Sequence, residues 1–194
     1  MTDFRKSPNP QGKGLVPVLE NLQLATKNLS VPAKDIHRVT NELFTSLFIL
    51  NSQIRFKPVC GQSYWLYRKN NEYRLSLISP EQWSPVQSGK YIGHCQLHCD
   101  LTWTLELSDA CRNDKELLAE IARQRQYFDK SVRQADTIDQ ILPVYDNNLP
   151  FYSRILAHAL SYSLRLSMQK SGISGMNLKE AEKLKTISKR SHID

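Results

Sequence analysis

Residues 63–83, SYWLYRKNNEYRLSLISPEQW, decide the fold class of this chain. Aromatic and leucine residues alternate with polar ones on both sides of Asn70 and Asn71, and asparagine tolerates the positive φ of a tight turn. The pattern therefore predicts a β-hairpin with a two-residue loop, in which Leu66 pairs with Leu75. The face expected to lie against the core carries Tyr64, Leu66, Tyr73, Leu75 and Leu77. The opposite face carries Trp65, Tyr67, Arg74 and Ser76.

The outward face of this hairpin is the first candidate site. Aromatic rings beside a cation on an open sheet can stack nucleobases and hold phosphates, and Trp65, Tyr67 and Arg74 supply these groups. A covering helix is the alternative, because amphipathic helices are available for that role. The exposure of the three side chains distinguishes the two interpretations. The full set of candidate binding residues is Trp65, Tyr67, Arg68, Arg74, Trp83 and Asp100.

A helix precedes the hairpin. Over residues 32–54, apolar residues recur at steps of three and four, and Pro32 suits a first helical turn. The stripe consists of Ile36, Val39, Leu43, Leu47, Leu50 and Ile54, and Phe44 and Phe48 widen it. We expect a core helix. A dimer helix is the alternative, because the steps also fit about three heptads.

Three further helices follow the hairpin module. Asp114 can cap the first, and Gly172 is placed to end the second, residues 149–170. The last begins at Asn177, with Glu180 completing a capping box. The apolar positions of the first helix are Leu117, Leu118, Ile121, Ala122 and Phe128. The second helix is basic and amphipathic, which suits a membrane surface, but its small polar residues make a weak membrane face, so we expect a helix packed in a bundle. These residues are Ser153, Ser161, Ser163 and Ser167.

The segment between hairpin and helices completes a small sheet. Ser79 and Pro80 predict a short helix that packs Trp83 onto the sheet, and residues 91–107 predict a further strand. The predicted fold class is α+β, with a small antiparallel β-meander, residues 63–107, packed against an N-terminal amphipathic helix and C-terminal helices. The expected organisation is a flexible tail over 1–14, a single domain over 15–172, and a basic C-terminal helix or tail over 173–194.

Residues 94–99, HCQLHC, look like a set of zinc ligands. In a strand, however, neighbours alternate between faces and rise about 3.3 Å each, so like residues four apart stand roughly 13 Å from each other. That separation is too large for one tetrahedral ion. The inward row is then Cys95, Leu97, Cys99, Leu101 and Trp103. We expect no metal, no cofactor and no catalytic residue.

Charge and composition narrow the class of protein. The 194 residues carry 26 Lys and Arg against 19 Asp and Glu, which gives a net charge of +7. The basic excess lies at the two ends of the chain, and a solvated surface explains it more simply than a nucleic-acid patch. No apolar run reaches membrane-spanning length. The N-terminal residues lack the apolar stretch of a secretory signal, so we expect a cytoplasmic protein with free thiols.

The middle of the chain resembles the family known as Domain of Unknown Function 2452. The resemblance rests on Leu66-Tyr67-Arg68, on Ile78-Ser79-Pro80 with Trp83, and on Gly93, Leu97, Asp100 and Trp103. The N-terminal stretch PNPQGKGLVPVLENL, residues 8–22, is also similar to bacterial members. Cys95 departs from the pattern, which has an aromatic residue there. The resemblance implies no activity, cofactor or catalytic residue.

These observations predict a non-enzymatic intracellular interaction or scaffold protein. The signature residues are aromatic residues, Leu, Ser-Pro and Gly, which build folds more often than they do chemistry. A protein partner or self-association is expected first. The alternative is RNA or single-stranded nucleic-acid binding through Trp65, Tyr67 and Arg74, and a weaker third hypothesis is a hydrolase with a Cys or Ser nucleophile. Gly61-Gln62-Ser63 begins like a nucleophile elbow, but Trp65 occupies the place of its second glycine.

Overall fold

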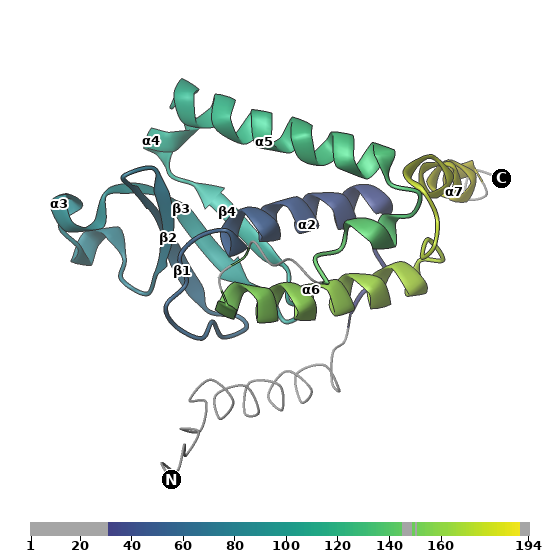
Figure 1. Ribbon diagram of the computed structural model, residues 1–194, viewed down its shortest axis with the longest axis horizontal. Coiled ribbons are helices and arrows are strands. Elements are labelled where there is room, and N and C mark those ends of the chain that lie inside the picture. The colour runs from purple at the N-terminus through teal and green to yellow at the C-terminus, as the bar shows by residue number, and fades with distance from the viewer. Residues whose placement is uncertain (1–30, 145–148, 150, 191–194) are drawn as a thin grey trace, which may run out of the picture. The chain divides into compact units, whose positions relative to one another are not determined.

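The computed structural model describes residues 31–144, 149 and 151–190 (Figure 1). The predicted tail over residues 1–14 and the start of the predicted domain lie outside these residues. The elements are α2 (Ile36–Leu50), β1 (Ser63–Lys69), β2 (Glu72–Ser76), the 3₁₀ turn η1 (Pro80–Gln82), α3 (Pro85–Ser88), β3 (Lys90–Leu97), β4 (Trp103–Leu107), α4 (Asp109–Arg112), α5 (Lys115–Gln134), the 3₁₀ turn η2 (Ile138–Ile141), α6 (Phe151–Lys170) and α7 (Leu178–Arg190). The predicted α+β class is confirmed.

The hairpin β1–β2 forms as predicted. Asn70 and Asn71 have φ values of 51° and 63°, which is the left-handed conformation of a two-residue hairpin loop. Leu66 pairs with Leu75, and both are buried. The prediction that Leu77 joins the core is wrong, because β2 ends at Ser76 and Leu77 is 59% exposed.

The order of the strands differs from a meander. The sheet has the order β2-β1-β3-β4, so β3 pairs with β1 and not with β2, its neighbour in sequence. The connection that holds η1 and α3 carries the chain from one side of β1 to the other. All three strand pairs are antiparallel. A hydrophobic pattern specifies the faces of strands but not their order across a sheet, which is why this feature was missed.

The predicted strand over residues 91–107 is two strands joined by a tight turn. Leu101, with φ of 65°, lies in the turn between β3 and β4. Alternation therefore stops at Leu97, and Cys99 is exposed although it was expected in the inward row. Cys95, Leu97, Leu101 and Trp103 are buried as predicted.

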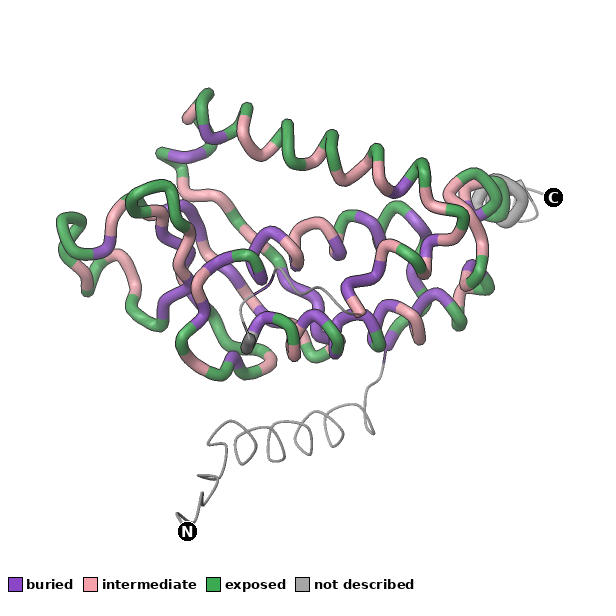
Figure 2. Tube along the Cα trace, viewed as in Figure 1, coloured by how far each residue is buried: buried purple, intermediate pink, exposed green. Residues whose placement is uncertain are grey.

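The helix α2 is the centre of the core. Its N-cap is Asp35, whose side chain accepts a hydrogen bond from the Arg38 amide, so the helix begins four residues after the predicted Pro32. Figure 2 shows buried residues along α2, in contrast to α5. One side of α2 packs on the sheet, where Ser46 accepts a hydrogen bond of 3.0 Å from the Trp103 amide. The predicted core helix is confirmed.

Ser167 of α6 and Ser171, directly after it, bring this helix close to the start of the described chain. Ser167 and Ser171 donate hydrogen bonds of 2.7 Å to the backbone oxygens of Pro32 and Lys34. Small side chains allow this approach, because they leave room for backbone to meet helix. Ser153, Ser161, Ser163 and Ser167 of α6 are all buried, so the serine-rich side of this helix faces the interior of the fold. Gly172, with φ of 69°, follows the end of α6 as predicted.

The two remaining predicted caps are also confirmed. Asp114 accepts hydrogen bonds of 3.1 Å from the amides of Glu116 and Leu117 at the start of α5. Asn177 and Glu180 form a reciprocal capping box, with both hydrogen bonds at 3.0 Å. Residues 173–190 therefore hold a helix, α7, as one of the two predicted alternatives.

Replacing Gly93 tests the close approach of β3 and β4. A Cβ atom at residue 93 would lie 2.2 Å from the backbone oxygen of Glu106, so the two strands would have to separate. We expect Gly93→Ala to lower the free energy of unfolding by about 3 kcal/mol, as measured by urea denaturation. The neighbouring variant His94→Ala should cost less than about 1 kcal/mol. Equal losses for the two variants would contradict the steric explanation.

Candidate functional site

The outward face of the hairpin packs beneath the η1 segment. The Tyr67 ring is 1% exposed, and its hydroxyl donates a hydrogen bond of 2.9 Å to the Ile78 backbone oxygen. Trp83 meets this ring edge-on at 5.3 Å between centroids. The Arg74 guanidinium lies over the same Trp83 ring, 4.8 Å from its centroid. Tyr67, Arg74 and Trp83 are therefore brought together, and they contact each other.

This packing leaves little of the face open to a ligand. Burial raises the pKa of Tyr67 to about 12, so the phenol stays protonated as a donor. Trp65 is partly buried and meets the edge of the His94 ring at 6.3 Å. The cover is the η1 connection and its Trp83 rather than a long amphipathic helix. The sequence identified the residues of the cluster correctly, but it did not indicate that they would satisfy one another.

Arg68 lies on the other face of the sheet. Its guanidinium pairs with the Glu120 carboxylate at 2.9 Å and lies 5.6 Å from the Tyr73 ring centroid. The Tyr73 hydroxyl donates to the same carboxylate at 3.3 Å. Burial, and then the nearby charge of Glu120, raises the pKa of Tyr73 to about 12. Arg68 thus attaches α5 to the sheet.

Asp100 belongs to a third place, a buried cluster of charges. Its carboxylate and that of Glu42 both accept hydrogen bonds from the Lys34 ammonium, whose side chain is 0% exposed. The Thr102 hydroxyl donates a hydrogen bond of 2.7 Å to the Asp100 carboxylate. The Arg38 guanidinium donates one of 2.8 Å to the Glu42 carboxylate. The cluster joins the residues before α2, α2 itself and the β3–β4 turn.

The balance of forces on Asp100 is visible in its pKa. Burial by itself raises the pKa of this carboxyl, but hydrogen bonds from Lys34 and Thr102 outweigh it, so the pKa lies below its usual value. All four oxygens of the two carboxylates have a donor. We therefore assign the cluster to stability, since every charge in it is already paired. Lys34 and Glu42 were missed, because their separation in sequence marks no motif.

The cysteines do not gather into a metal site. Cys95 is buried, and burial raises the pKa of its thiol, whereas Cys99 is exposed. His94 and His98 are partly buried, and His98 shares a hydrogen bond with Thr104 at 3.1 Å. Within residues 31–144, 149 and 151–190, no group of three or more His, Cys, Asp or Glu side chains is placed to hold a metal ion.

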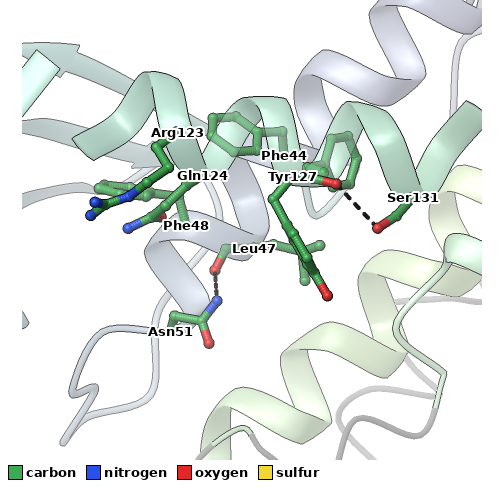
Figure 3. Close-up of a pocket in the computed structure, with 9 residues that line it drawn as sticks. Phe44, Leu47, Phe48, Asn51, Arg123, Gln124, Tyr127 and Ser131 are labelled. Atoms are coloured by element: carbon green, nitrogen blue, oxygen red, sulfur yellow. Dashed lines mark hydrogen bonds between the residues drawn. The ribbon is translucent and has the colours of Figure 1, made fainter. Parts of the chain in front are cut away.

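A groove of about 520 Å³ runs between α2 and α5 (Figure 3). We call it the α2–α5 groove. Its lining is mostly aromatic and aliphatic, with polar groups at the rim. The lining residues are Phe44, Leu47 and Phe48 from α2, Asn51 directly after this helix, and Arg123, Gln124, Tyr127, Phe128 and Ser131 from α5.

The groove exists because α5 is anchored at its two ends. Of its 20 residues, Leu117 near the start and Val132 near the end are buried. Between them, the rings of Phe44 and Phe128 meet at 5.6 Å between centroids. Arg125 stacks on both rings, at 5.1 and 5.8 Å, and pairs with Asp129 at 2.8 Å. These contacts hold the middle of α5 beside α2 without burying it (Figure 2).

Tyr127 is the most conspicuous residue of the groove. Its side chain is 77% exposed, and Figure 3 shows it extending from α5 on the side where Leu47 lies. The predicted stripe of α5 included Phe128 but not Tyr127, and no groove was predicted. An aromatic residue beside the stripe of a mostly polar helix was the signal that could have found it.

Among the described residues, the fold and its sites define an α+β protein with a buried charge cluster and an aromatic-lined groove between α2 and α5. A family model described as "Protein of unknown function (DUF2452)" matches residues 19–127, which is more than half of the chain. The chain belongs to this family. The predicted resemblance is thereby confirmed, and the match ends within α5 at Tyr127.

Two other comparisons were negative. No curated protein and no solved structure matches the chain significantly. Among the helices that the structure describes, none has the length and apolar character needed to cross a membrane.

Removing the Asp100 charge tests the role of the buried cluster. Asp100→Asn leaves the Lys34 ammonium with one carboxylate fewer in a site without solvent, and loss of one partner of a buried pair costs about 3–5 kcal/mol. We expect a loss of that order in urea denaturation at pH 7. Asp109→Asn, at an exposed carboxylate, is the matched control and should be nearly neutral.

The same cluster predicts a pH dependence of stability. The pKa of Asp100 is lower in the folded state than in the unfolded state. Its contribution to the free energy of unfolding is therefore complete above the unfolded-state pKa of about 3.9. It is lost as the pH falls through the lower folded-state pKa. The difference in unfolding free energy between wild type and Asp100→Asn should therefore shrink between pH 5 and pH 2. A constant difference over this range would contradict the assignment.

Proposed function

We propose that this protein is a non-enzymatic interaction protein whose binding surface is the α2–α5 groove. One observation carries the proposal: an aromatic-lined groove with Tyr127 largely exposed at its side. Tyr127 lies on an exposed side of α5 and contributes little to the core. Aromatic residues are, by contrast, enriched where proteins bind each other.

The chemistry-bearing side chains of the described chain give less support to an enzyme. Lys34, Glu42 and Asp100 neutralise one another in a buried cluster, so none of them faces a cavity with an unpaired charge. Burial raises the pKa of the Cys95 thiol, which opposes formation of a nucleophilic thiolate. The groove itself is lined mainly by groups that bind rather than react.

The nucleic-acid alternative has weaker support. It relied on open aromatic and cationic groups on the outer sheet face. The ring of Tyr67 is buried, and the guanidinium of Arg74 is engaged by Trp83. A base would have to displace these contacts before it could stack.

We propose that this protein binds its partner in the cytoplasm. Cys60, Cys95, Cys99 and Cys111 are free thiols. Four unpaired cysteines suit a reducing compartment.

The proposal is tested with exposed tyrosines on two helices. Tagged wild type, Tyr127→Ala and Tyr162→Ala are used to recover bound proteins from cells of the source organism. Tyr162, on α6, is 43% exposed and lies outside the lining of the groove, so it is the matched control. We expect a partner bound stoichiometrically by wild type and Tyr162→Ala, and reduced at least tenfold with Tyr127→Ala.

Tyr127→Ala should unfold within about 0.5 kcal/mol of wild type, because its side chain is largely exposed, and Tyr162→Ala, at a residue that is 43% exposed, should remain folded. Recovery of the same partner in equal amount by Tyr127→Ala would contradict the groove as the binding surface. Turnover of a substrate by the purified wild-type protein would contradict the non-enzymatic assignment.

A further inference from the structure

We infer that the α2–α5 groove binds an amphipathic helix of a partner protein, with apolar anchors on one face and carboxylates beside them. This inference rests on the proposed function and names the chemistry of the partner. Three features of the groove support it: its length, the composition of its floor, and the sign of the charge along its rim.

The length of the groove suits about two turns of helix. The α5 side of the lining extends from Arg123 to Ser131, which is roughly 12 Å at the rise of an α-helix. Phe44 to Asn51 supply a parallel row of similar length from α2. Apolar anchors at positions i, i+4 and i+7 of a third helix span the same distance, which is the usual geometry of a helix bound in a groove.

The floor and the rim divide the groove by polarity. Phe48 and Leu47 from α2 and Phe128 from α5 offer apolar surface to side chains that enter. The amides of Asn51 and Gln124 lie at the edges, where a bound helix would still be in contact with water. A partner with a narrow apolar stripe and polar flanks matches this arrangement.

The charged residue in the lining, Arg123, is basic, and the neighbouring part of α5 has an excess of basic residues. After Glu120, which pairs with Arg68, α5 carries four basic residues and a single acid, Asp129. Asp129 is already paired with Arg125 behind the groove. Arg123, in the lining, and Lys130, three residues after Tyr127, are exposed on the same side of α5. In the part of the chain described, neither forms an ion pair, so carboxylates on the partner complete the rim.

The charge pattern also argues against a second copy of this chain as the occupant. Two α5 helices that packed around their Tyr127 side chains would bring Arg123 and Lys130 of one copy close to the same residues of the other. Like charges at such a contact cost free energy and select against the pairing. An acidic helix avoids that repulsion.

A displayed library tests the inference with the full-length protein. The library consists of helical 16-residue peptides that are randomised at all positions exposed on the displayed helix. Peptides are selected for binding to immobilised wild type, and those that also bind Tyr127→Ala are removed. We expect enrichment of apolar residues at i, i+4 and i+7, with Asp or Glu flanking them. Enrichment of basic flanks, or no enrichment at all, overturns the inference.

A charge reversal provides the second readout. The best acidic peptide and the same peptide with Lys in place of each Glu and Asp are titrated by fluorescence anisotropy. We expect wild type to prefer the acidic peptide at least tenfold and Arg123→Glu to lose or reverse that preference. An unchanged preference in Arg123→Glu overturns the inference. Displacement of the peptide by single-stranded oligonucleotide at physiological salt also overturns it and favours nucleic acid.

The two proposals can fail separately. If Tyr127→Ala loses the cellular partner while acidic and basic peptides bind alike, the groove is a binding surface but its partner is not an acidic helix. If the cellular partner and the peptides are both indifferent to Tyr127→Ala, the proposed function fails as well. Tyr162→Ala controls for unspecific loss of binding in each assay.

Discussion

The buried ammonium of Lys34 is the constraint on which the arrangement of the core depends. A charge without solvent needs partners, and this one has the carboxylates of Glu42 and Asp100. The three residues come from three segments, so pairing them fixes the chain before α2 against the helix and against the β3–β4 turn. Ser167 of α6 and Ser171, directly after this helix, then bind the backbone of the same segment, including the backbone oxygen of Lys34. Electrostatics and close packing therefore specify one arrangement together.

Local patterns were sufficient to predict most of the elements. The Asn70–Asn71 turn, the Asp114 cap and the Asn177–Glu180 box each depend on residues a few positions apart, and all three are present. The strand order and the split of residues 91–107 were not predicted, because they depend on where the chain returns in space. Leu77 and Cys99 were placed in the core by extending an alternation past the true end of a strand.

The candidate site also divides into features that local sequence predicts and features that depend on distant parts of the chain. Six candidate binding residues were selected for their chemistry. Three of them, Tyr67, Arg74 and Trp83, form one cluster around the Trp83 ring. Arg68 and Asp100 lie elsewhere, each engaged by a partner that is distant in sequence. The groove was not predicted because it forms where α5 does not pack closely on α2. Periodicity can indicate which side of a helix is apolar, but it cannot indicate that the neighbouring helix leaves part of that side uncovered.

The anchoring of α5 at Leu117 and Val132 has a consequence for how this protein can change over time. Substitutions at exposed positions in the middle of the helix, such as Tyr127 and Lys130, touch neither the charge cluster nor the sheet. Folding therefore constrains them weakly. On the binding surface that we propose, exposed residues of α5 can therefore change the preference for a partner while the scaffold below remains the same.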